Sequence, residues 1–165
     1  MHLRRNTRLN CYNSVVAGWP IGLILDSEKG NTQKAATDGL LQLHRIVFAG
    51  TDLTGSDFNK VYKDELYDYK TKTTDPSKKS FSSMFFLLPA NGNKVVDQWV
   101  ARSWQGIQSI IAASTSVGGA LQGSFAELQS NNWFDKSATF VGAFRDASDD
   151  WTAGWANFDP ENTIY

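Results

Sequence analysis

The chain has 165 residues, a length that suits a single domain of which folding buries roughly 70% of the unfolded surface. Hydrophobic residues make up 41% and aromatic residues 13%, which argues against disorder. The net charge of −1 leaves no basic surface for phosphates, so we expect no nucleic-acid partner. No apolar run approaches the ~20 residues of a membrane-spanning helix, and the N-terminus lacks the apolar region of a signal peptide.

The most informative feature is a ten-residue repeat. Residues 9–18 (LNCYNSVVAG) and 41–50 (LQLHRIVFAG) align at a constant offset of 32 positions. Both copies begin with alternating apolar and polar residues, are rich in strand formers and end at glycine, where the chain can bend sharply. Residues 21–25 (IGLIL) predict a further strand, and residues 27–38 (SEKGNTQKAATD) predict a polar loop.

Repeats of strands and corners with periods of about 20–50 residues are typical of solenoid proteins. In a parallel β-helix, equivalent strands of successive turns would pair in parallel, with Leu9 above Leu41 and Val16 above Phe48. The alternative is an ordinary α+β domain in which two strands are similar by accident. The repeat favours a mainly β fold in which residues 1–55 form the last turns of a right-handed parallel β-helix.

The rest of the chain is expected to be less regular. Residues 56–94 predict an insertion-like loop region with a candidate strand at 81–88, and residues 95–165 predict short helices and an irregular C-terminal cap. Apolar spacing predicts a helix over 96–104. Ser124, followed three residues later by Glu127, has the pattern of a capping box that starts one helical turn.

Segments near both ends of the chain resemble a family of Bacteroidetes surface proteins. Residues 139–144 (TFVGAF) and 150–163 (DWTAGWANFDPENT) match the ending of that family, and residues 5–26 and 41–50 match it nearer the start, whereas 56–120 match poorly. The resemblance implies a right-handed parallel β-helix that is secreted or lies on the outer cell surface. It implies no defined activity and no catalytic residue.

The resemblance also predicts an open end. Members of the family have several turns before the first one found here, whereas this chain starts almost on a strand. We therefore expect the first turn to expose unpaired backbone groups and apolar side chains. A polysaccharide, a protein partner or another copy of the chain would then cover this end.

Few side chains have the spacing that metal binding or redox chemistry needs. His2 and His44 lack partners at metal-ligand spacing and are expected on the surface, and Cys11 is expected as a small buried hydrophobic residue. An acidic cluster in the C-terminal part could bind Ca²⁺, with solvated turn carboxylates as the alternative. It comprises Asp146, Asp149, Asp150, Asp159 and Glu161.

Enzymes with a parallel β-helix that cleave acidic polysaccharides use carboxylate and basic side chains on an exposed strand face. Arg8, Asp26 and Arg45 lie near predicted strands, but they form no repeated ladder. We therefore predict no catalytic residue. The alternative is that the chain is part of a polysaccharide lyase or hydrolase whose cleft lies mostly outside this segment.

Tryptophan side chains are the remaining candidates for binding. Trp19, Trp151 and Trp155 could contact a ligand, because an exposed aromatic ring can stack on a sugar. The alternative for Trp151 and Trp155 is packing as a lid over the end of the solenoid. The sequence thus favours a non-enzymatic cell-surface or secreted structural domain that binds by contact, with adhesion or glycan contact as its role.

Overall fold

The computed structural model describes residues 1–19, 22–50, 67–68, 73–74, 81–96, 114–157 and 160–162. Its strands are all short. They are β1 (His2–Arg4), β2 (Asn10–Tyr12), β3 (Val15–Ala17), β4 (Ile24–Asp26), β5 (Gln42–His44), β6 (Val47–Ala49), β7 (Tyr67–Asp68), β8 (Thr73–Thr74) and β9 (Lys94–Val96). The labelled helices are α1 (Thr32–Thr37), α2 (Phe81–Phe86) and the 3₁₀ turns η2 (Pro89–Asn91), η3 (Ala126–Leu128) and η4 (Pro160–Asn162). Residues 114–118 are helical as well.

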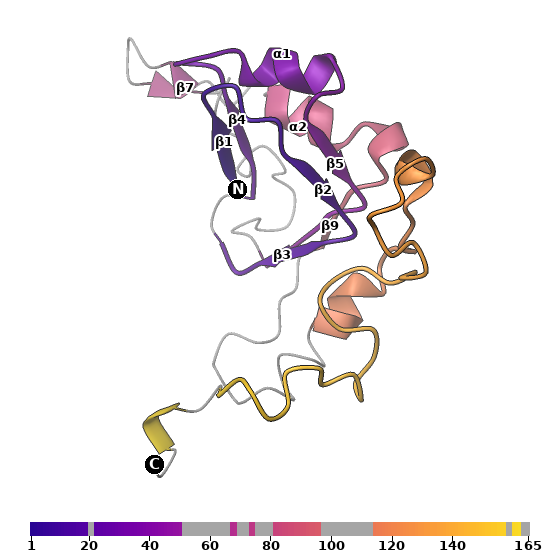
Figure 1. Cartoon of the computed structure of the whole chain (residues 1–165). Coiled ribbons are helices and arrows are strands. Elements are labelled where there is room, and N and C mark those ends of the chain that lie inside the picture. Colours follow the sequence, from indigo (N-terminus) through magenta and orange to yellow (C-terminus); the bar gives the residue numbers. More distant parts are fainter. Residues whose placement is uncertain are drawn as a thin grey trace.

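Parallel pairing dominates the sheets. β1 pairs with β4, β2 with β5, and β3 with β6, which in turn pairs with β9, while β7 and β8 form a separate antiparallel pair. Cys11 lies opposite Leu43 and Val16 lies opposite Phe48, so the pairing at an offset of 32 residues, predicted from the repeat, is confirmed. Figure 1 shows β1 beside β4 and β2 beside β5.

The predicted fold class, the last turns of a right-handed parallel β-helix, is wrong. Across the described ranges the strands form separate sheets of two or three strands, and no closed or solenoid sheet is present. A solenoid sheet needs every strand position to recur in successive turns. Here β4 and β5 are followed by no further parallel strand among the described residues, and α1 and α2 pack against β4 and against each other instead. The short repeat specifies local parallel pairing, not the number of turns.

Two segments are helical where the sequence predicted other structure. α1 lies within the predicted polar loop 27–38, because Ala35 and Ala36 form an apolar face that is buried in the core. α2 lies within the predicted strand 81–88. There the rings of Phe81 and Phe85 stack one helical turn apart, at 6.2 Å between centroids, which a strand would not allow.

One hydrophobic core holds the sheets and both helices together. It contains Leu23, Leu25, Ala35, Ala36, Leu41, Leu43, Ile46, Phe48, Phe85 and Phe86. Phe48 and Phe86 are fully buried, and their rings stack with centroids 4.4 Å apart. This contact joins the centre of the β3–β6–β9 sheet to α2.

Residues 114–157 pack on the outer face of the β3–β6–β9 sheet and then continue away from the sheets toward the C-terminus (Figure 1, orange to yellow). Val117 and Val141 join Val47 in a second apolar cluster. The chain segments approach closely, since a Cβ on Gly118 would lie 2.0 Å from the carbonyl oxygen of Val141. Within the described residues, no helix is long and apolar enough to cross a membrane.

The two predicted helices of the C-terminal half have different outcomes. The predicted helical turn after Ser124 is present as η3, and the Ser124 hydroxyl accepts a hydrogen bond from the N–H of its first residue, Ala126, at 3.2 Å. Of the helix predicted over 96–104, Val96 ends strand β9, and the remaining residues lie outside the described part of the chain.

Candidate binding surfaces

The first candidate site is a polar cluster where the repeat copies bend. Asn13 and Arg45 occupy the same repeat position, and both adopt left-handed backbone angles, with φ of 48° and 54°. The Nε of Arg45 donates to Oδ1 of Asn13 at 2.9 Å. Its two terminal nitrogens donate to the two carboxylate oxygens of Glu127, at 2.8 and 2.6 Å. This bidentate pair fixes η3 against the bend.

Aromatic and histidine side chains complete the cluster. The ring of His44 stacks on that of Tyr12, with 5.6 Å between centroids, and only 14% of the His44 side chain is exposed. His44 lies outside the core that holds the neighbouring Leu43, but the expectation of a surface histidine is wrong, because the segment around Glu127 covers the ring. Burial raises the pKa of Tyr12, assisted by the negative charge of Glu127.

The pKa values in the cluster favour a structural ion pair over acid–base catalysis. The hydrogen bond from Arg45 lowers the pKa of Glu127 to about 2, against the opposing effect of burial. Burial lowers the pKa of His44, and the charge of Arg45 acts in the same direction, although Glu127 opposes both. At neutral pH the Glu127 carboxylate is therefore ionised, with both oxygens occupied. It has no proton to donate to a substrate.

A second polar group surrounds Asp26, which is buried at the end of β4. His2 Nε2 lies 3.0 Å from its Oδ2, Arg4 Nε lies 3.7 Å from the same oxygen, and the backbone N–H of Glu28 donates to Oδ1 at 2.8 Å. Burial alone would raise the pKa of Asp26. The hydrogen bonds from Glu28 and His2, together with the charge of Arg4, outweigh it and lower the pKa overall.

The three charged residues singled out from the sequence are therefore not gathered in one site. Asp26 is paired with His2 and Arg4, Arg45 is paired with Glu127, and Arg8 is exposed in the turn before β2. Cys11 is partly buried against the core, and its Sγ donates to the Ser14 hydroxyl at 3.4 Å.

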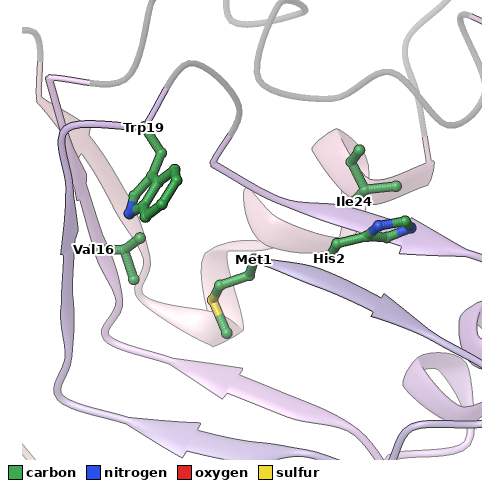
Figure 2. A pocket seen from close by; sticks show the side chains of 5 residues that line it. All are labelled: Met1, His2, Val16, Trp19 and Ile24. Carbon is green, nitrogen blue, oxygen red and sulfur yellow. The ribbon is translucent and has the colours of Figure 1, made fainter.

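A mainly apolar pocket of about 390 Å³ lies beside β1. It is lined by Met1, His2, Val16, Trp19 and Ile24. Figure 2 shows Trp19 and Val16 together on one side of the pocket, with His2 and Ile24 on the other and Met1 between them. Trp19 is 66% exposed, so its ring forms part of the rim. The described residues of the lining include no carboxylate, and this part of the pocket suits an apolar group.

The C-terminal tryptophans form an exposed aromatic surface. Trp151 is 53% exposed and Trp155 is 69% exposed, with 5.5 Å between ring centroids and 33° between ring planes. The ring N–H of Trp151 donates to the Ala143 carbonyl at 2.8 Å, and that of Trp155 donates to the Trp151 carbonyl at 2.9 Å. Both rings are held in place while most of their surface faces water, so they do not pack as a lid.

The acidic residues near these tryptophans close turns. Asp146 accepts hydrogen bonds from Ser148, Asp150 accepts from Thr152, and Asp149 accepts from the backbone N–H of Arg145. Among the residues that the structure describes, no group of three or more His, Cys, Asp or Glu side chains could hold a metal ion. Asp159, part of the cluster considered for Ca²⁺, lies outside the described residues.

No family model, curated protein or solved structure matches the chain. The resemblance of its two ends to Bacteroidetes surface proteins therefore stays a prediction.

Sequence reasoning missed one feature of these surfaces and assigned no role to a second. The Arg45–Glu127 pair joins residues 82 positions apart, and the one signal was the shared repeat position of Arg45 and Asn13. Trp133 is 84% exposed and makes an edge-to-face contact with Phe134, with centroids 5.1 Å apart. No local pattern distinguishes that pair from core aromatics.

Proposed function

We propose that this chain is a non-enzymatic binding domain, at the cell surface or secreted, that contacts glycans through Trp151 and Trp155. One observation carries the proposal: the two neighbouring rings are largely exposed, although hydrogen bonds fix both of them. Exposed aromatic surface of this kind is typical of interaction sites.

The chemistry of a sugar matches this surface. The C–H groups on one side of a pyranose ring form an apolar face that can stack on an aromatic ring, while its hydroxyl groups remain in water. Because Trp151 and Trp155 are already fixed, little side-chain freedom is lost on binding. The ring centroids of Trp151 and Trp155 lie 5.5 Å apart, so one oligosaccharide can contact both exposed rings.

The charged side chains favour binding over hydrolysis. A glycoside hydrolase needs two carboxyl groups on either side of the scissile bond, one of them protonated. In the described residues Glu127 and Asp26 are each paired with an arginine, and the pKa of each is lowered. The proposed surface location rests on the family resemblance alone.

The test is binding to soluble polysaccharides. The purified chain would be run in native gels that contain xylan, mannan, β-glucan or hydroxyethyl cellulose, and retardation would be measured. We expect retardation by at least one polysaccharide, and Trp151→Ala and Trp155→Ala to weaken the affinity about three- to tenfold each.

Trp133→Ala is the matched control, since it removes an exposed tryptophan from the same C-terminal segment. It should leave retardation unchanged. Absence of retardation by every polysaccharide, or an equal loss in all three variants, would contradict the proposed function.

A further inference from the structure

Among the described residues, the parallel sheets have one edge without strand partners. In the described part of the chain, β1, β2 and β3 are each the terminal strand of their sheet. The chain forms these three strands in succession and then lays β4, β5 and β6 beside them in the same order. The outer edges of β1, β2 and β3 together are called the open edge below.

The hydrogen bonds show which backbone groups face this edge. The Ser14 carbonyl accepts a hydrogen bond from the N–H of Val47, and the N–H of Gly18 donates to the Ala49 carbonyl. Alternate residues along this segment therefore form their backbone hydrogen bonds with β6. In a parallel ladder the residues between them, Val15 and Ala17, direct their N–H and C=O groups to the other side.

The same alternation holds in β2 and β1. The Leu9 carbonyl accepts a hydrogen bond from the N–H of Gln42, and the N–H of Asn13 donates to the His44 carbonyl. The backbone N–H and C=O groups of Asn10 and Tyr12 therefore face the open edge. In β1, Met1 accepts from Ile24, which directs His2 outward.

At the opposite edge, along β4 and β5, side chains bond to the backbone groups. There the backbone N–H of Leu25 donates to the Ser82 hydroxyl at 2.8 Å, and Gln33 donates to the Leu25 carbonyl at 2.9 Å. The side chain of Asn93 accepts from the N–H of Ile46 at 2.8 Å and donates to the Leu43 carbonyl at 2.9 Å. These partners satisfy the backbone groups that a further strand would use. No described side chain performs this role for Val15, Ala17 or Asn10.

The apolar side chains show the same asymmetry. Leu25, Leu43 and Phe48 are fully buried, whereas the residues paired with them, Leu3, Cys11 and Val16, are only partly buried. Of these residues, Val16 lines the pocket of about 390 Å³. The described residues thus cover the core fully on the side of α1 and α2, and only partly at the open edge.

Charge indicates what covers the open edge. Residues 1–19 contain Arg4, Arg5 and Arg8 and no carboxylate. Arg5 and Arg8 are exposed in the turn between β1 and β2, while the neighbouring Asp26 is already paired. A second copy docked through the same face would bring arginines to arginines, which is unfavourable.

From this juxtaposition we propose that the open edge binds an acidic polypeptide partner in extended conformation. The partner adds parallel or antiparallel strands beside β2 and β3, sets carboxylates against Arg5 and Arg8, and inserts an apolar side chain into the pocket. The main-chain bonds supply affinity, and the pocket and the arginines supply specificity. This surface is separate from the tryptophan pair, so the two proposals stand or fall independently.

A designed peptide tests the proposal. A short capped peptide in which valine alternates with glutamate would be titrated into the ¹⁵N-labelled chain and followed by NMR. We expect the amide signals of Val15 and Ala17 to shift and their hydrogen exchange to slow. An N-methylated peptide of the same sequence cannot complete the ladder, and it should bind at least about tenfold more weakly.

Variants of the chain give the second arm of the test. Ala17→Pro removes an N–H that faces the open edge and leaves the ladder to β6 intact, and it should weaken binding about five- to tenfold. Ala17→Ser retains the N–H and serves as the control. Because the methylated peptide is tested on the unaltered chain, the proposal stays falsifiable even when Ala17→Pro does not fold.

Three results would overturn the proposal. The first is no binding of the glutamate peptide. The second is equal binding of the methylated peptide, which would indicate charge attraction alone. The third is equal or tighter binding of a matching peptide with lysine in place of glutamate. Concentration-dependent dimerisation with shifts at Val15 and Ala17 would identify a second copy as the occupant, and would equally overturn the assignment to an acidic partner.

Discussion

The sheet region and the C-terminal segment are held in place by different forces. In the sheet region, parallel ladders surround fully buried side chains such as Phe48 and Leu43. In residues 114–157, Val117 and Val141 pack on the sheet, and the rest of the order comes from close backbone contacts, from turns that carboxylates close, and from the Arg45–Glu127 pair. A change in the core should therefore unfold the whole molecule, whereas a change in the contacts of the C-terminal segment should release that segment alone.

The largest effect is expected from Phe48→Ala. This side chain is fully buried between the central sheet and α2, and its removal leaves a cavity beside Phe86. The free energy of unfolding should fall by about 3–5 kcal/mol. Chemical denaturation followed by circular dichroism would measure the loss. A decrease below 1 kcal/mol would show that Phe48 does not sustain the core.

A smaller effect is expected from Gly118→Ala. The added Cβ would meet the carbonyl of Val141 at 2.0 Å, so the two backbone segments must move apart. Overpacking of this kind costs about 1–3 kcal/mol. Hydrogen exchange should increase in residues 114–142, whereas that of β5 and β6 should stay as in the unaltered chain. Equal acceleration in both regions would show that they unfold together. Gly119→Ala is the comparison variant, since its Cβ would meet the Thr115 carbonyl oxygen at 3.3 Å, a much milder contact, and its effect should be smaller.

The smallest effect is expected from Glu127→Gln, which keeps the shape of the side chain but removes its charge. The hydrogen bonds to Arg45 would weaken, and the docking of η3 should lose about 1 kcal/mol, because the pair is partly exposed. Proteolysis near residue 130 would report this loss as faster cleavage. Cleavage at an unchanged rate would mean that the pair contributes no docking energy.

The same pair predicts a dependence on pH. The pKa of Glu127 is about 2 in the folded chain and near 4.5 when the carboxyl group is free, so the folded value is lowered. Its stabilising contribution is complete above pH 4.5 and is lost as the pH falls from 4.5 toward 2. Hydrogen exchange of residues 124–134, corrected for the intrinsic rate, should accelerate over that range. Glu127→Gln should remove the dependence, and a persistent one would assign it to another group.

The sequence predicted those features that depend on neighbouring residues. The repeat predicted the pairing of Val16 with Phe48, and the alternation around His44 predicted its outward direction. The prediction from sequence was wrong where contacts between distant residues determine the secondary structure. The apolar run at 81–88 is compatible with a strand or a buried helix, and the contact of Phe86 with Phe48 favours the helix.

The candidate sites show the same division. Trp19, Trp151 and Trp155 were found from residue type alone, and all three are exposed. The Arg45–Glu127 pair could not be predicted, because no local spacing links residues 82 positions apart.

Asn13 joins the sheet region to the C-terminal segment. Its Oδ1 accepts hydrogen bonds both from Arg45 Nε, at 2.9 Å, and from the backbone N–H of Ser124, at 3.1 Å. The second contact closes a loop of 111 residues, which has the larger entropic cost. The first forms once β2 and β5 have paired, and only then are Asn13 and Arg45 together in position to receive Ser124 and Glu127. We therefore expect the C-terminal segment to dock after the sheets have formed, which a refolding experiment would record as a slower phase.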